Sequence, residues 1–273
     1  MKARVNYVVG PSTLVPFAFD AAWSGIPTEP VEVEVADVRA SGEAPSIERE
    51  GLRLGRIDAR GVDYGDVHEI GGKWIPAAID FVKATTGAQW VIPWGHNVRF
   101  SNRSEKSLST PTSAPARHVH SDFSADFDPA QILHAPKLSP AAAEELRSLL
   151  RSGAELRWRT FNVWQQISPP PHDTPLALCD ARTVLPEDIV VGRGAVGDIS
   201  VDLCLFRASP RHRWLHVSDM APGETLIFSG LDPHAGGALK RVPHTAFDHP
   251  LCPPGAAPRN SIEVRVLAVA PLN

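Results

Sequence analysis

Alternating apolar and polar positions mark the region near the N-terminus as strand-forming. In PVEVEVADVRA, Val31, Val33 and Val35 alternate with acidic residues, a period of two that is typical of a half-buried strand. The chain then turns at SGEAP, and IEREGLRLGRI, residues 47–57, predicts a further pair of short strands.

Two later segments have the pattern of helices. Residues 74–87, WIPAAIDFVKATTG, place apolar side chains at helical spacing and end at a glycine. Residues 139–153, SPAAAEELRSLLRSG, begin with Ser139 as N-cap and Pro140 at the first helical position, and they too end at a glycine. We expect both helices to pack on the outside of the strands that follow.

The second half of the chain alternates short apolar segments with clusters of Pro, Gly, Asp and Ser. Many short strands with little helix between them favour an antiparallel barrel or jelly roll over a parallel α/β sheet. The fold class is therefore mainly β with flanking helices, and no linker divides residues 1–273 into more than one domain. The predicted strands lie within 156–167, 176–182, 201–209, 212–219, 224–230 and 261–270.

Composition excludes several classes of protein. Apolar residues make up 43% and the net charge is −4, so there is no basic field for nucleic acid or a membrane surface. No run approaches the roughly 18 apolar residues of a membrane span, and the N-terminal apolar stretch is broken by Gly10, Pro11 and Pro16, against a signal peptide. Three cysteines without a CxxC pair indicate a reduced, cytoplasmic setting, and a homodimer stays open.

The stretch ARHVHSDFS contains a candidate metal site. In an extended strand His118, His120 and Asp122 project from one face. Two imidazoles and a carboxylate on one side of an iron leave its other side open for substrate, cofactor or oxygen. His244, in RVPHTAFDHP, is the distant second histidine of this pattern, and a three-histidine site of His118, His120 and His244 is the alternative.

An Arg-x-Ser pair follows His244 by fifteen residues. The Arg259 guanidinium offers a planar fork for the far carboxylate of 2-oxoglutarate, and the Ser261 hydroxyl adds a hydrogen bond on the same strand face. Arg265 shares that face by parity and is the second choice as clamp. The ordered set His-x-Asp, His, Arg-x-Ser is much more specific than any one of its parts.

These motifs, with TGAQWVIPWGHNVR, FNVWQQI, PLALCDAR and PRNSIEVR, resemble the CmcJ/AsaB/NvfI-type oxidoreductases, which include the GA4-desaturase-like proteins. The resemblance runs from about residue 31 to the C-terminus. It implies a double-stranded β-helix and a non-haem Fe(II)- and 2-oxoglutarate-dependent oxygenase. On matching positions it implies His120, Asp122 and His244 as iron ligands, with Arg259 and Ser261 holding 2-oxoglutarate.

Other polar residues are candidates for the cosubstrate or the substrate. Asn162, in RTFNVW, is expected to contact 2-oxoglutarate or substrate. Arg157 and Arg159 alternate onto one face and either meet an anionic substrate or pair with acidic residues. His216 lies in RWLHVSDM, where the chain departs from the family's aromatic-rich stretch, so it is a substrate candidate as well.

The predicted activity is oxidation of a C–H bond in a small, specialised-metabolism molecule. Fe(II), 2-oxoglutarate and O2 are the expected cofactors, and succinate and CO2 the co-products. Hydroxylation, desaturation and oxidative cyclisation stay open as outcomes. Two alternatives are a three-histidine iron dioxygenase without 2-oxoglutarate and a non-catalytic metabolite-binding barrel. Only the favoured interpretation predicts that Arg259→Ala abolishes 2-oxoglutarate binding.

Overall fold

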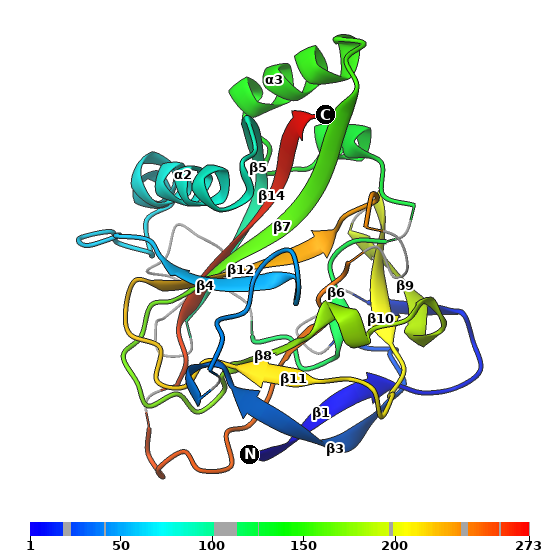
Figure 1. Ribbon diagram of the computed structural model, residues 1–273, viewed down its shortest axis with the longest axis vertical. Coiled ribbons are helices and arrows are strands. Elements are labelled where there is room, and N and C mark those ends of the chain that lie inside the picture. Colours follow the sequence, from blue (N-terminus) through cyan, green and yellow to red (C-terminus); the bar gives the residue numbers. More distant parts are fainter. Residues whose placement is uncertain are drawn as a thin grey trace.

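Two β-sheets account for most of the structure and face each other (Figure 1). This computed structural model describes residues 1–18, 23–40, 42–100, 114–124, 126–196, 199–235, 240–256 and 258–272. Side chains join the facing sheets, as when the Ser121 hydroxyl donates to the Gly230 carbonyl at 3.3 Å. The prediction of a mainly β fold is confirmed.

The smaller sheet has five strands, all antiparallel. In sheet order the strands are β4 (Leu52–Arg56), β12 (Glu224–Leu231), β7 (Leu156–Gln166), β14 (Ser261–Pro271) and β5 (Trp90–Arg99). Strand β14 pairs with β7 over its whole length and with β5 from Ser261 to Val269, so most of this strand is held on both sides.

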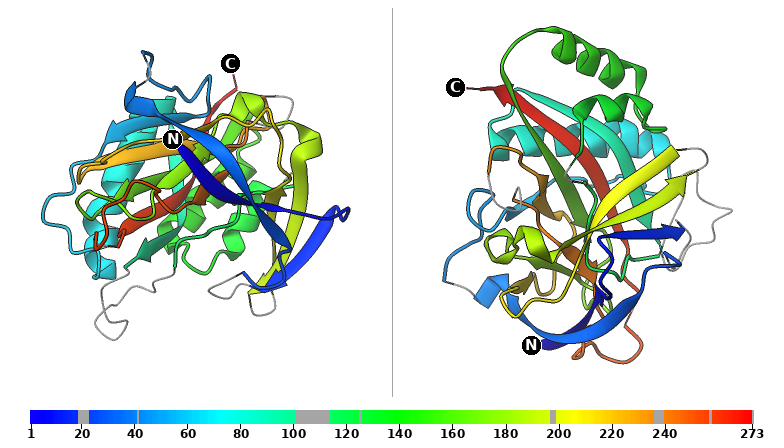
Figure 2. Two further views of the ribbon diagram at one scale, coloured as in Figure 1. Left: turned by 90° about the horizontal axis from the view of Figure 1, so that it is seen from below. Right: turned by 90° about the vertical axis from the view of Figure 1, so that its right-hand side faces the viewer.

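The larger sheet has nine strands and is mixed, because β3 runs parallel to β11 and β2 parallel to β9. The N-terminal strands extend a C-terminal core at both edges of this sheet, as the views in Figure 2 show. In sheet order the strands are β1 (Lys2–Val8), β3 (Thr28–Asp37), β11 (Trp214–His216), β8 (Leu176–Cys179), β13 (His244–Ala246), β6 (His120–Ser121), β10 (Ile199–Phe206), β9 (Ile189–Val196) and β2 (Leu14–Ala18).

Both predicted helices are present. Helix α3 (Pro140–Arg151) begins at Ser139, whose hydroxyl accepts from the Ala142 amide at 3.2 Å. Helix α2 (Ile75–Thr86) ends at Gly87, which has a φ of +70°, but helical structure starts earlier than the sequence predicts. There α1 (Val67–Glu69) and a π-helical turn (Ile70–Trp74) precede it. Short 3-10 turns lie at Val38–Ala40, Pro129–His134, Ala181–Thr183 and Pro186–Asp188.

Alternation along β7 and β14 divides the smaller sheet into two faces. Phe161 and Val163 of β7 join Val264 and Val266 of β14 in the apolar cluster that packs on α2. We call this the outer face. The inner face, made by the intervening residues, looks toward the larger sheet, while α3 packs on the far part of β14.

The predicted strand pair at 47–57 is wrong in part. Only Leu52–Arg56 forms a strand, β4, and it pairs with β12 rather than with residues before it. Residues 47–50 form a turn instead, because the Ser46 amide donates to the Glu50 carboxylate at 2.9 Å and the Ser46 hydroxyl accepts from the Arg49 amide. Local side-chain hydrogen bonds thus replace a strand ladder there.

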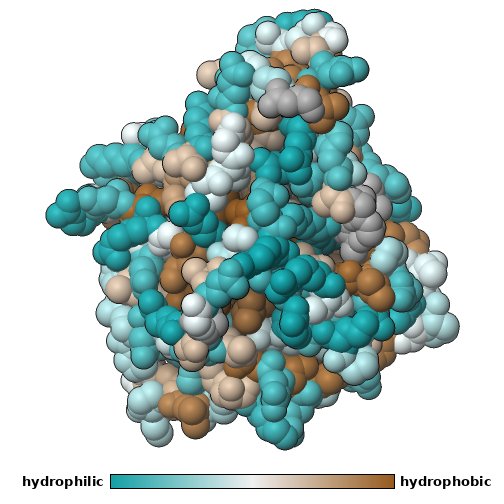
Figure 3. Space-filling view, in the orientation of Figure 1, coloured by the Kyte–Doolittle hydropathy of each residue, from teal (hydrophilic) through white to brown (hydrophobic). Residues whose placement is uncertain are grey.

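Hydrophilic residues cover most of the face shown in Figure 3, with small hydrophobic groups between them. Single exposed apolar side chains of this kind are normal for a protein surface. No helix in the described part of the chain is long and apolar enough to cross a membrane.

Candidate metal centre and cosubstrate site

Three side chains predicted as metal ligands meet between the sheets. His120 lies on β6 and His244 on β13, directly opposite each other in register, and Asp122 follows β6. One ligand atom of each lies within 4.8 Å of the others. The two imidazole rings are 4.3 Å apart and both residues are 4% exposed. Within the described residues this is the group whose geometry fits a metal ion.

Backbone carbonyls orient both imidazoles in the same way. Nδ1 of His120 lies 2.7 Å from the His118 carbonyl, and Nδ1 of His244 lies 3.2 Å from the Val242 carbonyl. A hydrogen bond donated by Nδ1 leaves Nε2 with its lone pair for a metal. Burial lowers the pKa of His120 to about 3, with His244 adding to the effect, so this imidazole stays in the neutral form that a metal requires.

The carboxylate of Asp122 is held from the inner face of the smaller sheet. Arg265 Nη2 lies 3.0 Å from Oδ1, and Asn162 Nδ2 donates to Oδ2 at 2.6 Å. Burial alone would raise the pKa of Asp122, but Arg265 and the two imidazoles hold that pKa well below its usual range. The carboxylate is therefore charged and fixed before any ion binds.

Arg259 and Ser261 lie further along the same face. Arg259 is 2% exposed, donates from Nη1 to the Thr174 carbonyl at 2.7 Å, and stacks 5.4 Å from the Trp164 ring centre. Burial, with the nearby charge of Arg99, lowers the pKa of Arg259 to about 9. Ser261 is fully buried, and its hydroxyl makes no hydrogen bond to the residues described. A buried hydroxyl of this kind is ready for a ligand.

Strand register sets the spacing between these groups. Asn162, beside Asp122, and Trp164, beside Arg259, are two residues apart on one face of β7, which is about 7 Å along a strand. A dicarboxylate with a five-carbon chain spans such a distance. The metal group (His120, Asp122 and His244) and the Arg259 guanidinium are thus placed at the two ends of one region of the inner face, which we call the slot.

Comparison with known proteins agrees with this arrangement. The family model "Oxidoreductase/YMDC permease-like domain" matches residues 5–269. The hydroxylase/desaturase efuI of Hormonema carpetanum is 29% identical over 88% of this chain and 83% of its own. The Fe(II)/2-oxoglutarate-dependent dioxygenase nvfI of Aspergillus novofumigatus is 32% identical over 74% of this chain and 68% of its own. The chain belongs to this oxygenase family.

The fold agrees as well. A solved structure of the iron and alpha-ketoglutarate-dependent endoperoxidase NvfI has a TM-score of 0.81 against this chain, with 22% identity, covering 100% of this chain and 98% of that one. The predictions of a jelly-roll fold, of the CmcJ/AsaB/NvfI-type family and of a dioxygenase are confirmed. As a member of this family the chain uses Fe(II), 2-oxoglutarate and O2, and it acts on a small molecule.

Arg157 and Arg159, for which an anionic substrate and acidic partners were both open, do not lie beside the metal group. They are on the outer face of β7, with Phe161, whereas Asn162, which binds Asp122, is on the inner face. Arg157 pairs with Asp232 at 2.6 Å, and Arg159 donates to the Thr86 carbonyl at the end of α2. Of the two roles open for these arginines, the structure contains the pairing with acidic residues.

His216 is also turned away from the metal group. Its neighbour Leu215 is opposite Leu178 on β8, and Leu178 is opposite His244, so these three side chains share the inward face. His216 therefore points to the other side, where its ring meets Phe247 and His249 at centroid distances of 6.0 and 6.1 Å. Within RWLHVSDM, the departure from the family pattern at His216 therefore lies away from the metal group, whereas Leu215 faces inward.

Three residues of the site have no role in the sequence prediction. Trp23 places its ring 4.8 Å from that of His120, and Phe228 places its ring 4.8 Å from that of His244. Glu263 accepts a hydrogen bond from Asn162 at 2.9 Å. Parity with Ser261 could have identified Glu263, but nothing in the sequence connects Trp23 with a histidine about a hundred positions later.

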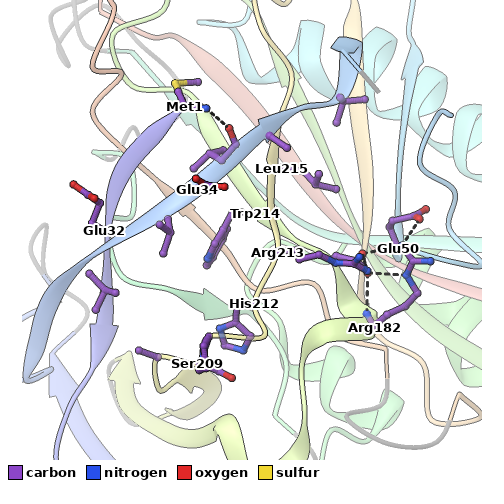
Figure 4. A pocket seen from close by; sticks show the side chains of 18 of the residues that line it. Met1, Glu32, Glu34, Glu50, Arg182, Ser209, His212, Arg213, Trp214 and Leu215 are labelled. Carbon is purple, nitrogen blue, oxygen red and sulfur yellow. Dashed lines mark hydrogen bonds and ion pairs between the residues drawn. The ribbon is translucent and has the colours of Figure 1, made fainter. Parts of the chain in front are cut away.

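A groove of about 1000 Å³ lies elsewhere, over β3 and β11 (Figure 4). None of the three metal-site side chains lines it. Its basic side chains are already matched, since Arg182 pairs with Glu50 at 2.7 Å and Arg213 with Asp180 at 2.8 Å. The groove therefore lacks the charge and the ligand set that the family's chemistry needs.

Proposed function

We propose that His120, Asp122 and His244 hold the iron of this oxygenase. Two Nε2 atoms and one carboxylate oxygen on one side of an ion are the ligand set of non-haem Fe(II) oxygenases, and they leave the opposite side open. The observation that carries this proposal is the convergence of the three groups within 4.8 Å between two sheets. His118, the alternative ligand, is outside this group, and its carbonyl orients His120 instead.

We propose that Arg259 and Ser261 bind the far carboxylate of 2-oxoglutarate. The buried guanidinium offers a charged fork, and the Ser261 hydroxyl supplies a donor that has no protein acceptor among the described residues. Arg265, the rival clamp, is engaged with Asp122 beside the metal group. The keto-acid end of the cosubstrate would then face the metal ligands.

The substrate is, on this proposal, a small specialised metabolite that is oxidised at a C–H bond. Iron, 2-oxoglutarate and O2 together supply the oxidising equivalent and release succinate and CO2. The chain's own residues orient the ligands, neutralise the cosubstrate and keep water out of the slot. Its relatives are named as hydroxylases, desaturases and an endoperoxidase, so hydroxylation and desaturation lead, with oxidative cyclisation as a further outcome.

The test is a visible spectrum of anaerobic protein with Fe(II), before and after addition of 2-oxoglutarate. A weak charge-transfer band that needs both components, and that is lost in Asp122→Ala and Arg259→Ala, is the expected result. His118→Gln is the matched control and keeps the band. If His118→Gln abolishes the band and Asp122→Ala does not, the three-histidine alternative replaces this proposal; no band in the wild type with iron bound favours the non-catalytic barrel.

We further propose that residues 1–273 act as one oxygenase domain, since β1 and β3 continue the sheet that carries His120 and His244. The homodimer and the cytoplasmic location stay predictions. So does the lack of nucleic-acid and membrane partners, which rests on the net charge of −4. Light scattering of the purified chain measures the oligomeric state directly.

A further inference from the structure

Both oxygens of Asp122 are held by side chains of the smaller sheet. Arg265 binds Oδ1 and Asn162 binds Oδ2, at 3.0 and 2.6 Å. Asn162 is fully buried, and its second Nδ2 hydrogen goes to Glu263 at 2.9 Å. This amide orientation is the one that electrostatics allows, because the flipped amide would direct Oδ1 at two carboxylates.

Glu263 connects the two groups that hold Asp122. It lies between Ser261 and Arg265 on the inner face of β14, and it is 7% exposed. Its Oε1 accepts from Asn162 and lies 3.8 Å from Arg265 Nε. A second carboxylate beside the slot should weaken binding of a dianionic cosubstrate, because like charges in a buried site repel. Its presence there therefore suggests a role other than binding the cosubstrate.

We propose that Glu263 is a positioning residue for the metal ligand Asp122, acting through Asn162 and Arg265. The inference rests on the proposed iron site. It gives Asn162 a task different from the contact with 2-oxoglutarate that the sequence predicts, since both of its amide hydrogens are used within the protein. The network holds the Asp122 carboxylate in one orientation as the ion arrives, so its loss weakens metal binding before it affects the cosubstrate.

The experiment titrates metal-free protein with Co(II), followed by its visible ligand-field bands, and then titrates 2-oxoglutarate at saturating Co(II). Asn162→Leu and Glu263→Ala are expected to weaken Co(II) binding by about 10–100-fold, the usual effect of losing an outer partner of a metal ligand. Glu263→Gln keeps an oxygen acceptor for Asn162 and is expected to retain more of the affinity. Binding of 2-oxoglutarate to the Co(II) forms should change little.

Gln165→Leu is the matched control. Gln165 is a buried amide on the outer face of β7, bonded to Trp74 at 2.7 Å and Thr225 at 3.0 Å, so its loss lowers stability without reaching Asp122. Co(II) affinities that are unchanged in Asn162→Leu and Glu263→Ala, with only stability reduced as in Gln165→Leu, would overturn the positioning role. Weaker 2-oxoglutarate binding with normal Co(II) binding would also overturn it. If the wild-type protein binds no Co(II), the proposed iron site itself is wrong.

Discussion

The outer and inner faces of β7 and β14 are both largely buried but differ in chemistry. On the outer face Phe161, Val163 and Val264 pack on α2 as an ordinary apolar core. On the inner face Asn162 and Glu263 are buried as well, yet they are polar and bonded to one another. The same two strands thus supply packing on one side and a prearranged polar site on the other.

The difference shows how a β-barrel can keep a reactive interior without losing its fold. Buried polar groups are costly unless they are hydrogen-bonded, and most inner-face groups are satisfied within the protein. Some buried polar atoms, such as Ser261 Oγ and Asn162 Oδ1, make no hydrogen bond to the residues described. Stability and ligand binding should therefore be separable by mutating one face or the other.

The largest effect is expected on the inner face, from Asp122→Ala. This change removes a proposed metal ligand rather than a partner of one, so it should reduce Co(II) affinity by more than about 100-fold, the upper range for losing an outer partner. The outer face is untouched, and urea unfolding should stay cooperative. Equal Co(II) affinity in variant and wild type, measured by the same titration, would remove Asp122 from the site.

On the outer face, Phe161→Ala should cost about 3–5 kcal/mol in the free energy of unfolding, because it leaves a cavity between β7 and α2. Arg159, stacked 5.3 Å over that ring, would lose its contact as well. Urea denaturation measures the change. Co(II) affinity of the folded variant should match the wild type, and a fall in that affinity would show that the two faces are coupled.

Arg259→Ala returns to the inner face and should raise the Kd for 2-oxoglutarate by about 30-fold or more, since breaking a buried charge pair costs about 2–5 kcal/mol. Calorimetric titration of 2-oxoglutarate into the Co(II) protein gives the value. Arg259→Lys keeps the positive charge but loses the planar fork, so its Kd for 2-oxoglutarate should lie between those of the wild type and Arg259→Ala. If Arg265→Lys, and not Arg259→Ala, weakens 2-oxoglutarate binding, Arg265 is the clamp.

The smallest effect is a pH dependence from His96, which is opposite Val264 and so belongs to the outer face of β5. Burial, helped by the charge of Lys137, lowers the pKa of His96 to about 4 from its ordinary 6.5. As the pH falls from 6.5 toward 4, the unfolded chain takes up a proton that the folded chain does not, so stability decreases. His96→Gln should show a shallower fall in urea midpoint over this range. If the urea midpoints of the wild type and His96→Gln fall in parallel with pH, His96 has the same pKa in the folded and unfolded chains.

Much of the fold could be predicted from local signals. The Ser139 cap with Pro140 and the Gly87 stop predicted two helices, and alternation predicted β3. Short apolar segments between clusters of turn residues predicted β7 and β14. Strand β5 gave no such signal, because Pro93 and a bulge opposite the Arg265–Val266 step interrupt its pattern.

The proposed ligands His120, Asp122 and His244 and the proposed cosubstrate pair Arg259 and Ser261 could be named from the sequence, since spacing and residue type limit the chemistry strongly. Parity also grouped Arg157 with Arg159 correctly, because side chains alternate along any strand. Which face of a strand looks inward was decided only in three dimensions. It depends on what packs on each side, here α2 outside and the Asp122 segment inside, and those partners lie 40 or more positions before Asn162 in the sequence. The assignments of Arg157, Arg159 and His216 changed for that reason, whereas that of Asn162 changed because its amide hydrogens bind Asp122 and Glu263.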